Sequence, residues 1–190
     1  MKKTLLALFG LMLTLAVSAQ TKVSQATTWN FADKQNGEVL ADKIVDMNGL
    51  YLRGGADKHS INAKKVGCKL QLSDGTNYSA KMAAGCSGGM FWKNIKATSK
   101  ADQIFSKGDM CYAMEIAVPG TLQIIANPKG GLEGKGRMAK LFFNGQEVYN
   151  RSFDEKGAFE VLYKADKPGT FFFGANGAMF VYQVKFTPAQ

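Results

Sequence analysis

Two short motifs in the sequence resemble catalytic loops, but each lacks a partner that its chemistry needs. Residues 85–89 have the G-x-S-x-G spacing of a nucleophile elbow, in which Ser87 would attack a carbonyl carbon. The single histidine, His59, precedes this serine, whereas an α/β-hydrolase needs its histidine later in the chain. A trypsin-like set would crowd His59, Asp74 and Ser87 into too short a segment. We therefore expect a surface loop.

The glycine-rich residues 130–136 approach a phosphate-binding loop. They lack a hydroxyl residue after Lys135 and lead toward an expected strand, not toward a helix that could hold a phosphate. One histidine and three widely spaced cysteines also give no usable set of four zinc ligands. We expect a hairpin loop here and no zinc site.

Acidic and amide side chains gather near the N-terminus and could bind a hard cation. Their oxygen atoms suit calcium, but their spacing matches no known calcium loop. The same residue types also form turns, which is the interpretation that we favour. Calcium therefore stays open as a cofactor, with Asp33, Asp46 and Asn48 as candidate ligands beside Asn36 and Asp42.

A carbohydrate site needs an exposed aromatic ring beside polar groups, because a sugar has an apolar C–H face and a polar rim. Residues 91–94 read Phe-Trp-Lys-Asn directly after a glycine-rich loop and supply both kinds of group. We predict a ligand site that is formed by Trp92, Lys93, Asn94, Tyr51 and Arg53.

A polysaccharide lyase or glycoside hydrolase is the enzymatic alternative. His59, Arg53 and Tyr51 have the residue types of a lyase base and its neutralising partners. A hydrolase needs two carboxylates facing one bond, and no such pair stands out. Tyr182 also has the residue type of a lyase base, but the alternation of residues 179–186 places it in the core. We therefore predict no catalytic residues.

The elements that must position such a site are β-strands almost throughout. Residues 110–118 alternate, with Met110, Tyr112, Met114, Ile116 and Val118 on one face. Pro119-Gly120 ends this strand and residues 121–126 resume it, which predicts a hairpin. Residues 179–186 alternate in the same way, and we expect one face to carry Phe180, Tyr182, Val184 and Phe186.

Asn-Gly and Asp-Gly pairs support this interpretation, because they tolerate the positive φ of two-residue hairpin turns. They occur at residues 36–37, 48–49, 74–75, 144–145 and 176–177. The clearest predicted hairpin joins residues 137–143 to residues 146–153 through Asn144-Gly145, and a further strand is expected at residues 158–164. About nine to eleven short strands with few helical signals predict an all-β protein, an antiparallel β-sandwich of the jelly-roll or galactose-binding-like kind.

The N-terminus predicts export. Lys2 and Lys3 precede an apolar run, and Val17-Ser18-Ala19 forms a small-residue cleavage site, so residues 1–19 are expected to be a signal peptide and residues 20–190 a single domain. No apolar run is long enough for a transmembrane span. We expect a secreted, periplasmic or cell-surface protein.

The net charge of +9 rests almost wholly on lysines that are scattered along the chain. Nucleic-acid binding favours clustered arginines, so it is not expected. A solvated surface is the favoured interpretation, and an acidic polysaccharide or anionic cell surface is the alternative. Cys68, Cys86 and Cys111 allow at most one internal disulfide, and the spacing leaves its pairing open.

Several short stretches carry a resemblance in order and spacing over nearly the whole expected domain. They are residues 28–31 and 47–52, the 110–126 segment with its Pro119-Gly120 corner, and the closing strand 177–186. They resemble the jelly-roll domains of secreted pectate-lyase-like and other polysaccharide-processing proteins of Gram-negative bacteria. The resemblance implies a non-catalytic sandwich like a carbohydrate-binding module, sometimes with a structural calcium.

An adhesion or assembly subunit of the cell surface is the other alternative, with a protein partner. Residues 170–173 read Thr-Phe-Phe-Phe without polar alternation, which indicates a strand that is covered on both sides or one that meets a partner. An exposed apolar edge at these phenylalanines would favour adhesion.

Overall fold

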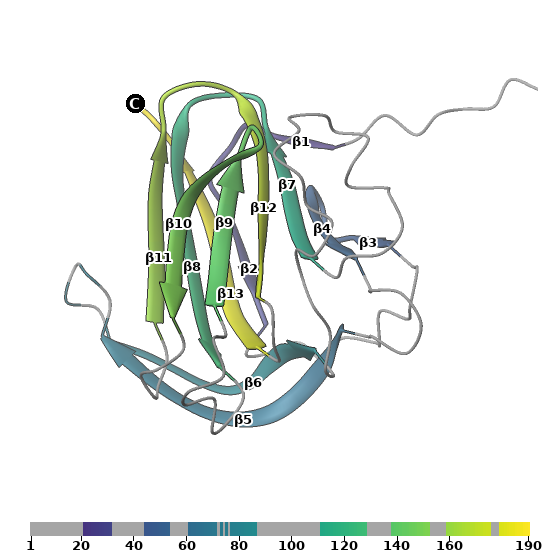
Figure 1. The fold of residues 1–190 in the computed structure, drawn as a ribbon, viewed down its shortest axis with the longest axis vertical. Coiled ribbons are helices and arrows are strands. Elements are labelled where there is room, and N and C mark those ends of the chain that lie inside the picture. The colour runs from purple at the N-terminus through teal and green to yellow at the C-terminus, as the bar shows by residue number, and fades with distance from the viewer. Residues whose placement is uncertain are drawn as a thin grey trace, which may run out of the picture.

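The computed structural model describes residues 21–31, 44–53, 61–71, 73, 75, 77–86, 111–128, 138–152, 159–175 and 179–190. Within these ranges every regular element is a strand (Figure 1). In chain order they are β1 (Lys22–Val23), β2 (Thr27–Asn30), β3 (Ile44–Asp46), β4 (Leu50–Arg53), β5 (Ile61–Gln71), β6 (Asn77–Cys86), β7 (Cys111–Ile116), β8 (Gly120–Pro128), β9 (Met138–Phe143), β10 (Gln146–Ser152), β11 (Phe159–Ala165), β12 (Gly169–Ala175) and β13 (Met179–Pro188).

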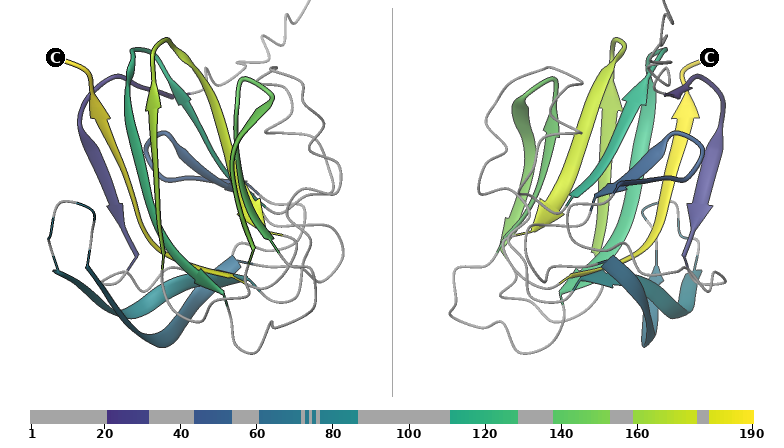
Figure 2. Two further views of the ribbon diagram at one scale, coloured as in Figure 1. Left: turned by 60° about the vertical axis from the view of Figure 1, so that its left-hand side comes forward. Right: turned by 90° about the vertical axis from the view of Figure 1, so that its right-hand side faces the viewer.

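The strands form two sheets, which confirms the predicted all-β sandwich. Sheet A has the order β10-β9-β12-β7-β4-β3, with β1 added parallel to β7. Sheet B has the order β11-β8-β13-β6-β5, with β2 added antiparallel to β13. The two views of Figure 2 show β2 and β13 side by side in sheet B and the β9–β10 hairpin in sheet A. The long β5–β6 hairpin curves across one end of the sandwich (Figure 1).

The core lies between the sheets and is filled by alternate residues of facing strands. Tyr112, Met114 and Ile116 of β7 are at most 3% exposed, as their alternation predicted. Trp29 and Phe31 are also buried and belong to this core. Burial of a large apolar side chain contributes about 1.5–3 kcal/mol, so this layer is the main stabilising feature of the fold.

The predicted hairpin between residues 110–118 and 121–126 is wrong. β7 lies in sheet A and β8 lies in sheet B, so the Pro119-Gly120 corner carries the chain from one sheet to the other (Figure 1). At this corner the Ala117 N–H donates to the Val23 carbonyl of β1. The chain therefore leaves the β7 ladder without turning back on it.

The expected single face of residues 179–186 is also interrupted. The pairing of β13 with β8 shifts register between Val181 and Gln183, which is a β-bulge at Tyr182. One extra residue reverses the alternation, so Met179 and Val181 join Val184 in the inner core. Tyr182 is fully buried, as predicted, although it does not belong to that inner cluster.

Three of the predicted turns are present. Asn144 and Gly145 have φ values of 49° and 79° in the β9–β10 hairpin. Asn48 and Gly49 have 57° and 91° between β3 and β4. Gly75 has 87° in the β5–β6 hairpin. The other two predicted turns, at residues 36–37 and 176–177, lie outside the described residues.

The three consecutive phenylalanines lie on β12, a central strand between β9 and β7. Phe171, Phe172 and Phe173 are 1–2% exposed, so the strand is covered on both faces, which is the first of the two interpretations that the sequence left open. The exposed apolar edge that would favour an adhesion subunit is not found at these residues.

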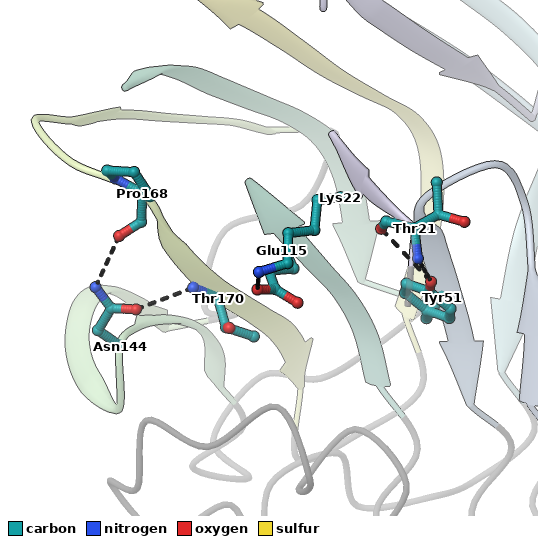
Figure 3. A network of polar contacts seen from close by, with 7 residues as sticks. All are labelled: Thr21, Lys22, Tyr51, Glu115, Asn144, Pro168 and Thr170. Carbon is teal, nitrogen blue, oxygen red and sulfur yellow. Dashed lines mark hydrogen bonds and ion pairs between the residues drawn. The ribbon is translucent and has the colours of Figure 1, made fainter. Parts of the chain in front are cut away.

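The N-terminal strands link the two sheets, since β1 pairs with sheet A and β2 with sheet B. Lys22 forms an ion pair with Glu115 at 2.7 Å beside this junction (Figure 3). No helix of the described ranges is both long and apolar enough to cross a membrane. The expected signal peptide, residues 1–19, lies outside these ranges, as do the glycine-rich stretch 130–136 and most of residues 85–89.

The backbone register limits the disulfide pairing that the sequence left open. In the β5–β6 hairpin, Ile61 lies opposite Cys86, and Cys68 lies opposite Ala80. Cys68 and Cys86 are therefore about 20 Å apart along the ladder, at about 3.3 Å per residue. A disulfide requires Cα atoms within about 7 Å, so this pair does not form one.

Candidate functional site

A cavity of about 520 Å³ lies where the β9–β10 turn approaches the turn that follows β11. We call it the end pocket. Its volume lies within the range of about 300–1,000 Å³ that is usual for small-molecule sites. The residues that line it are Phe143, Asn144, Gln146, Tyr163, Asp166 and Lys167.

Two turns position these residues. The β9–β10 turn of sheet A supplies Asn144 and Gln146, and the residues after β11 of sheet B supply Asp166 and Lys167. Both turns lie at the upper end of the sandwich in Figure 1. The pocket is therefore formed between the β10 edge of sheet A and the β11 edge of sheet B.

Asn144 connects the two turns directly (Figure 3). Its side-chain Oδ1 accepts a hydrogen bond from the Thr170 N–H at 2.9 Å, and its Nδ2 donates to the Pro168 carbonyl at 3.5 Å. Its backbone N–H donates to the Thr170 carbonyl at 2.9 Å. These bonds fix the β9–β10 turn against the start of β12.

Aromatic rings form the wall of the pocket that is continuous with the core. The Tyr163 ring lies 5.6 Å from the Phe143 ring and 5.8 Å from the Phe171 ring, measured between centroids. Phe143 and Phe171 are 4.6 Å apart. Tyr163 is only partly buried, while the other two are buried, so Tyr163 is the aromatic residue of this group that keeps solvent-accessible surface.

The charges at the pocket belong to Asp166 and Lys167, which are both exposed. Burial raises the pKa of the Tyr163 hydroxyl, and the negative charge of Asp166 raises it further. Tyr163 is therefore neutral at physiological pH and presents a hydroxyl that can donate and accept. Asp166 is the only carboxylic acid among the described lining residues.

Tyr51, which was predicted to contact a ligand, lies on β4 and is 4% exposed. Its hydroxyl accepts a hydrogen bond from the Thr21 N–H at 2.7 Å (Figure 3), and burial raises its pKa. The backbone of Arg53 is at the end of the same strand. The structure thus places this pair away from the end pocket, and Trp92, Lys93 and Asn94 lie outside the described residues.

Asp46 and Asn48, two of the candidate calcium ligands, lie in the β3–β4 turn. The Asp46 carboxylate accepts the Gly49 N–H at 2.8 Å and the Thr21 hydroxyl at 3.3 Å. These bonds are those of a turn-forming aspartate, the interpretation that the sequence favoured. In the described ranges no three acidic, histidine or cysteine side chains gather as a metal site, and Asp33, Asn36 and Asp42 are not within them.

The end pocket was not predicted from the sequence. Its residues come from two turns that lie apart in the chain, and neither turn contains a tryptophan. One signal was present: each turn has an aromatic residue beside polar ones, as in Phe143-Asn144-Gly145-Gln146 and in Tyr163 followed by Asp166 and Lys167.

Comparisons with known proteins place the chain near no established family. No family matches the sequence, and no curated protein does. Among solved structures, the CBM22-1 xylan-binding domain of Paenibacillus barcinonensis Xyn10C is similar with a TM-score of 0.42 and 9% identity, over 89% of this chain and 99% of that one. CBM51 of Clostridium perfringens GH95, in complex with methyl-galactose, gives 0.37 and 8%, over 85% and 100%.

A further similar structure contains CBM51-2 in complex with GlcNAc and INT domains of Clostridium perfringens ZmpB. It gives a TM-score of 0.41 at 6% identity and covers 82% of this chain, which spans only 33% of that structure. At these values the likeness describes the general outline of a β-sandwich. It does not support the Gram-negative origin that the sequence resemblance implied.

Proposed function

We propose that the protein binds a carbohydrate in the end pocket and does not act on it chemically. The observation that carries this proposal is the combination, around one cavity of about 520 Å³, of the partly exposed Tyr163 with the polar side chains of Gln146, Asp166 and Lys167. A ring beside hydrogen-bonding groups matches the apolar face and polar rim of a sugar.

The exposed lining of the pocket is mainly polar. Most small-molecule sites are lined mainly by apolar side chains, so a mainly polar lining departs from the usual site and suits a ligand that carries many hydroxyl groups. Gln146 offers an amide donor and acceptor, Asp166 an acceptor and Lys167 a donor. Together they can bind several hydroxyls while the sugar ring packs on Tyr163.

Binding is favoured over hydrolysis by the acid content of the pocket. Glycoside hydrolysis uses two carboxylates about 5–10 Å apart, as acid and as base or nucleophile. Asp166 is the one acid that the described lining supplies. Burial, with a further contribution from the Asp166 charge, raises the pKa of Tyr163, so Tyr163 stays protonated and is a hydrogen-bonding group and a poor general base.

Export belongs to the same proposal. A carbohydrate ligand on a polysaccharide or a cell surface is reached outside the cytoplasm, which fits the leader-like residues 1–19. N-terminal sequencing of the protein recovered from the medium and from the cell envelope tests this point. A mature chain that begins at Gln20 is expected, and an intact Met1 would contradict export by this route.

A glycan array followed by isothermal titration calorimetry tests the binding proposal on residues 20–190. Tyr163→Ala is expected to lower the affinity for the array hit by at least about tenfold, because it removes the packing surface. Tyr163→Phe keeps the ring and is expected to retain most of the affinity. Leu162→Ala is the matched control, since Leu162 is adjacent on β11, 53% exposed and not part of the pocket.

Loss of the ring also weakens contacts with Phe143 and Phe171, so all variants are compared well below their melting temperatures. Trp92→Ala is included because the site at Trp92, Lys93 and Asn94 stays a prediction. If Trp92→Ala abolishes binding and Tyr163→Ala does not, the glycan binds at residues 91–94 and the end pocket is refuted.

A further inference from the structure

We propose that Asn144 is a positioning residue, which holds the β9–β10 turn and the β11–β12 turn in the relative arrangement that binds the ligand. This inference rests on the proposed function of the end pocket. It assigns to Asn144 a role beyond lining the cavity.

Three hydrogen bonds from one residue support this role. The Asn144 side chain bonds the Thr170 N–H and the Pro168 carbonyl, and its backbone N–H bonds the Thr170 carbonyl. Thr170 is itself 5% exposed, so its N–H lies where water replaces a lost partner poorly. A loss of the Asn144 side chain therefore leaves a donor that only movement of the turn can satisfy.

Gly169 lies against the Asn144 amide and leaves no room for a larger residue. A Cβ atom on Gly169 would lie 2.3 Å from the Asn144 Oδ1, 2.5 Å from its Nδ2 and 2.6 Å from the Phe143 Cε2. These distances are far inside van der Waals contact. The Asn144 amide is thus packed directly on the backbone of the second turn as well as bonded to it.

The consequence for the pocket follows from which residues stand next to this contact. Gln146 is two residues after Asn144, and Asp166 and Lys167 directly precede Pro168. The β9–β12 ladder pairs Phe143 with Phe171 and so brings the two turns side by side. Beyond the end of that ladder, the Asn144 side chain bonds residues 168 and 170 and holds the two groups of ligand-binding side chains relative to one another.

Asn144→Gly tests the proposal, because glycine keeps the positive φ of 49° and removes only the side chain. Asn48→Gly is the matched control: Asn48 also has a positive φ, 57°, in a hairpin turn, and it lies outside the pocket lining. We expect Asn144→Gly to weaken sugar binding about tenfold in calorimetry, while Asn48→Gly leaves the affinity unchanged.

Two readouts do not require a ligand. Hydrogen exchange of the Thr170 amide is expected to accelerate about tenfold in Asn144→Gly, through loss of its acceptor. The absorbance titration of Tyr163, read as the difference from Tyr163→Phe, is expected to move to lower pH as Asp166 is released from its position. Gly169→Ala is expected to give the same changes, and the double variant less than the sum of the two.

Wild-type values of affinity, Thr170 exchange and Tyr163 titration in Asn144→Gly would overturn the proposal. An equal loss of affinity in Asn48→Gly would also overturn it, because the effect would then be general to turns. If the wild-type protein binds no sugar, the proposed function fails, while the exchange and titration results still decide whether Asn144 positions the two turns.

Discussion

The corner between β7 and β8 permits a sharp test at Gly120. A Cβ atom at this position would lie 2.5 Å from the Phe186 Cζ, 2.7 Å from its Cε2 and 2.6 Å from the Thr187 carbonyl oxygen. Phe186 is fully buried, and the carbonyl belongs to the backbone of β13. Neither neighbour can move without disturbing the core, so we expect Gly120→Ala to destabilise the protein.

The loss of stability in Gly120→Ala is the difference between the cost of overpacking and the gain from restricting the unfolded chain. Overpacking of a core by one carbon costs about 1–3 kcal/mol. Because the added carbon also clashes with strand backbone, we expect a cost of about 3 kcal/mol at Gly120. The backbone of Gly120 is not in the positive-φ region, so alanine recovers about 0.4–1 kcal/mol by restricting the unfolded chain. The expected net loss in free energy of unfolding is about 2–2.5 kcal/mol.

Urea denaturation, monitored by fluorescence and circular dichroism, measures this loss. Gly75→Ala is the control, because no atom lies within 4 Å of its Cβ and only its φ of 87° is unfavourable, which costs about 1–2 kcal/mol. A second variant adds Phe186→Leu to shorten the ring, and the double change is expected to cost about 1 kcal/mol less than the sum. A Gly120→Ala protein within about 0.5 kcal/mol of wild type, the range of surface changes, would refute the reasoning.

Four other predictions concern the pKa of Tyr163, the pH dependence of stability, the β3–β4 turn and the effect of calcium. Asp166→Asn is expected to lower the pKa of Tyr163 toward its ordinary value, measured by absorbance near 295 nm; an unchanged pKa would show that burial alone raises it. Because the folded pKa values of Tyr51 and Tyr163 are both raised, the folded state holds their protons more tightly than the unfolded state does. This stabilisation is complete below about pH 10 and is lost as the pH rises through the folded pKa values; a melting temperature that stays constant from pH 9 to pH 11 would contradict it. Asp46→Ala is expected to cost about 1 kcal/mol in thermal unfolding, because the Gly49 N–H loses its acceptor, and added calcium is expected to leave the wild-type melting temperature unchanged.

Features of the fold that depend on neighbouring residues could be predicted from the sequence. The Asn144-Gly145 and Asn48-Gly49 turns follow from the positive φ that these residues tolerate. The alternation of Tyr112, Met114 and Ile116 gave the inner face of β7 correctly. Each of these signals is contained in a few consecutive residues.

Features that depend on distant partners could not be predicted. A Pro-Gly corner suits a hairpin and a change of sheet equally well, and the choice is made by the partners of β7 and β8 elsewhere in the chain. The bulge at Tyr182 reverses the alternation of β13 without any change in residue type. Both errors arise from tertiary pairing.

The candidate site shows the same limit. A tryptophan beside polar residues indicated a site at residues 91–94. The end pocket instead brings together Gln146, after the β9–β10 turn, and Asp166 and Lys167, after β11. Only the meeting of the β9–β10 and β11–β12 turns places them together. The sequence contained the right residue types for this site but not their proximity.

The link that β1 and β2 make between the sheets also governs when the fold can form. Trp29 pairs with Val184, and Lys22 pairs with Glu115. The first strands of the domain therefore pair with strands that lie far along the chain. Such non-local pairing gives a high contact order, which slows folding because a long loop must close first. During synthesis β1 therefore stays unpaired until β7 has been made, and β2 stays unpaired until β13 has been made. The last strand of the domain is therefore the one that completes the pairing of β2.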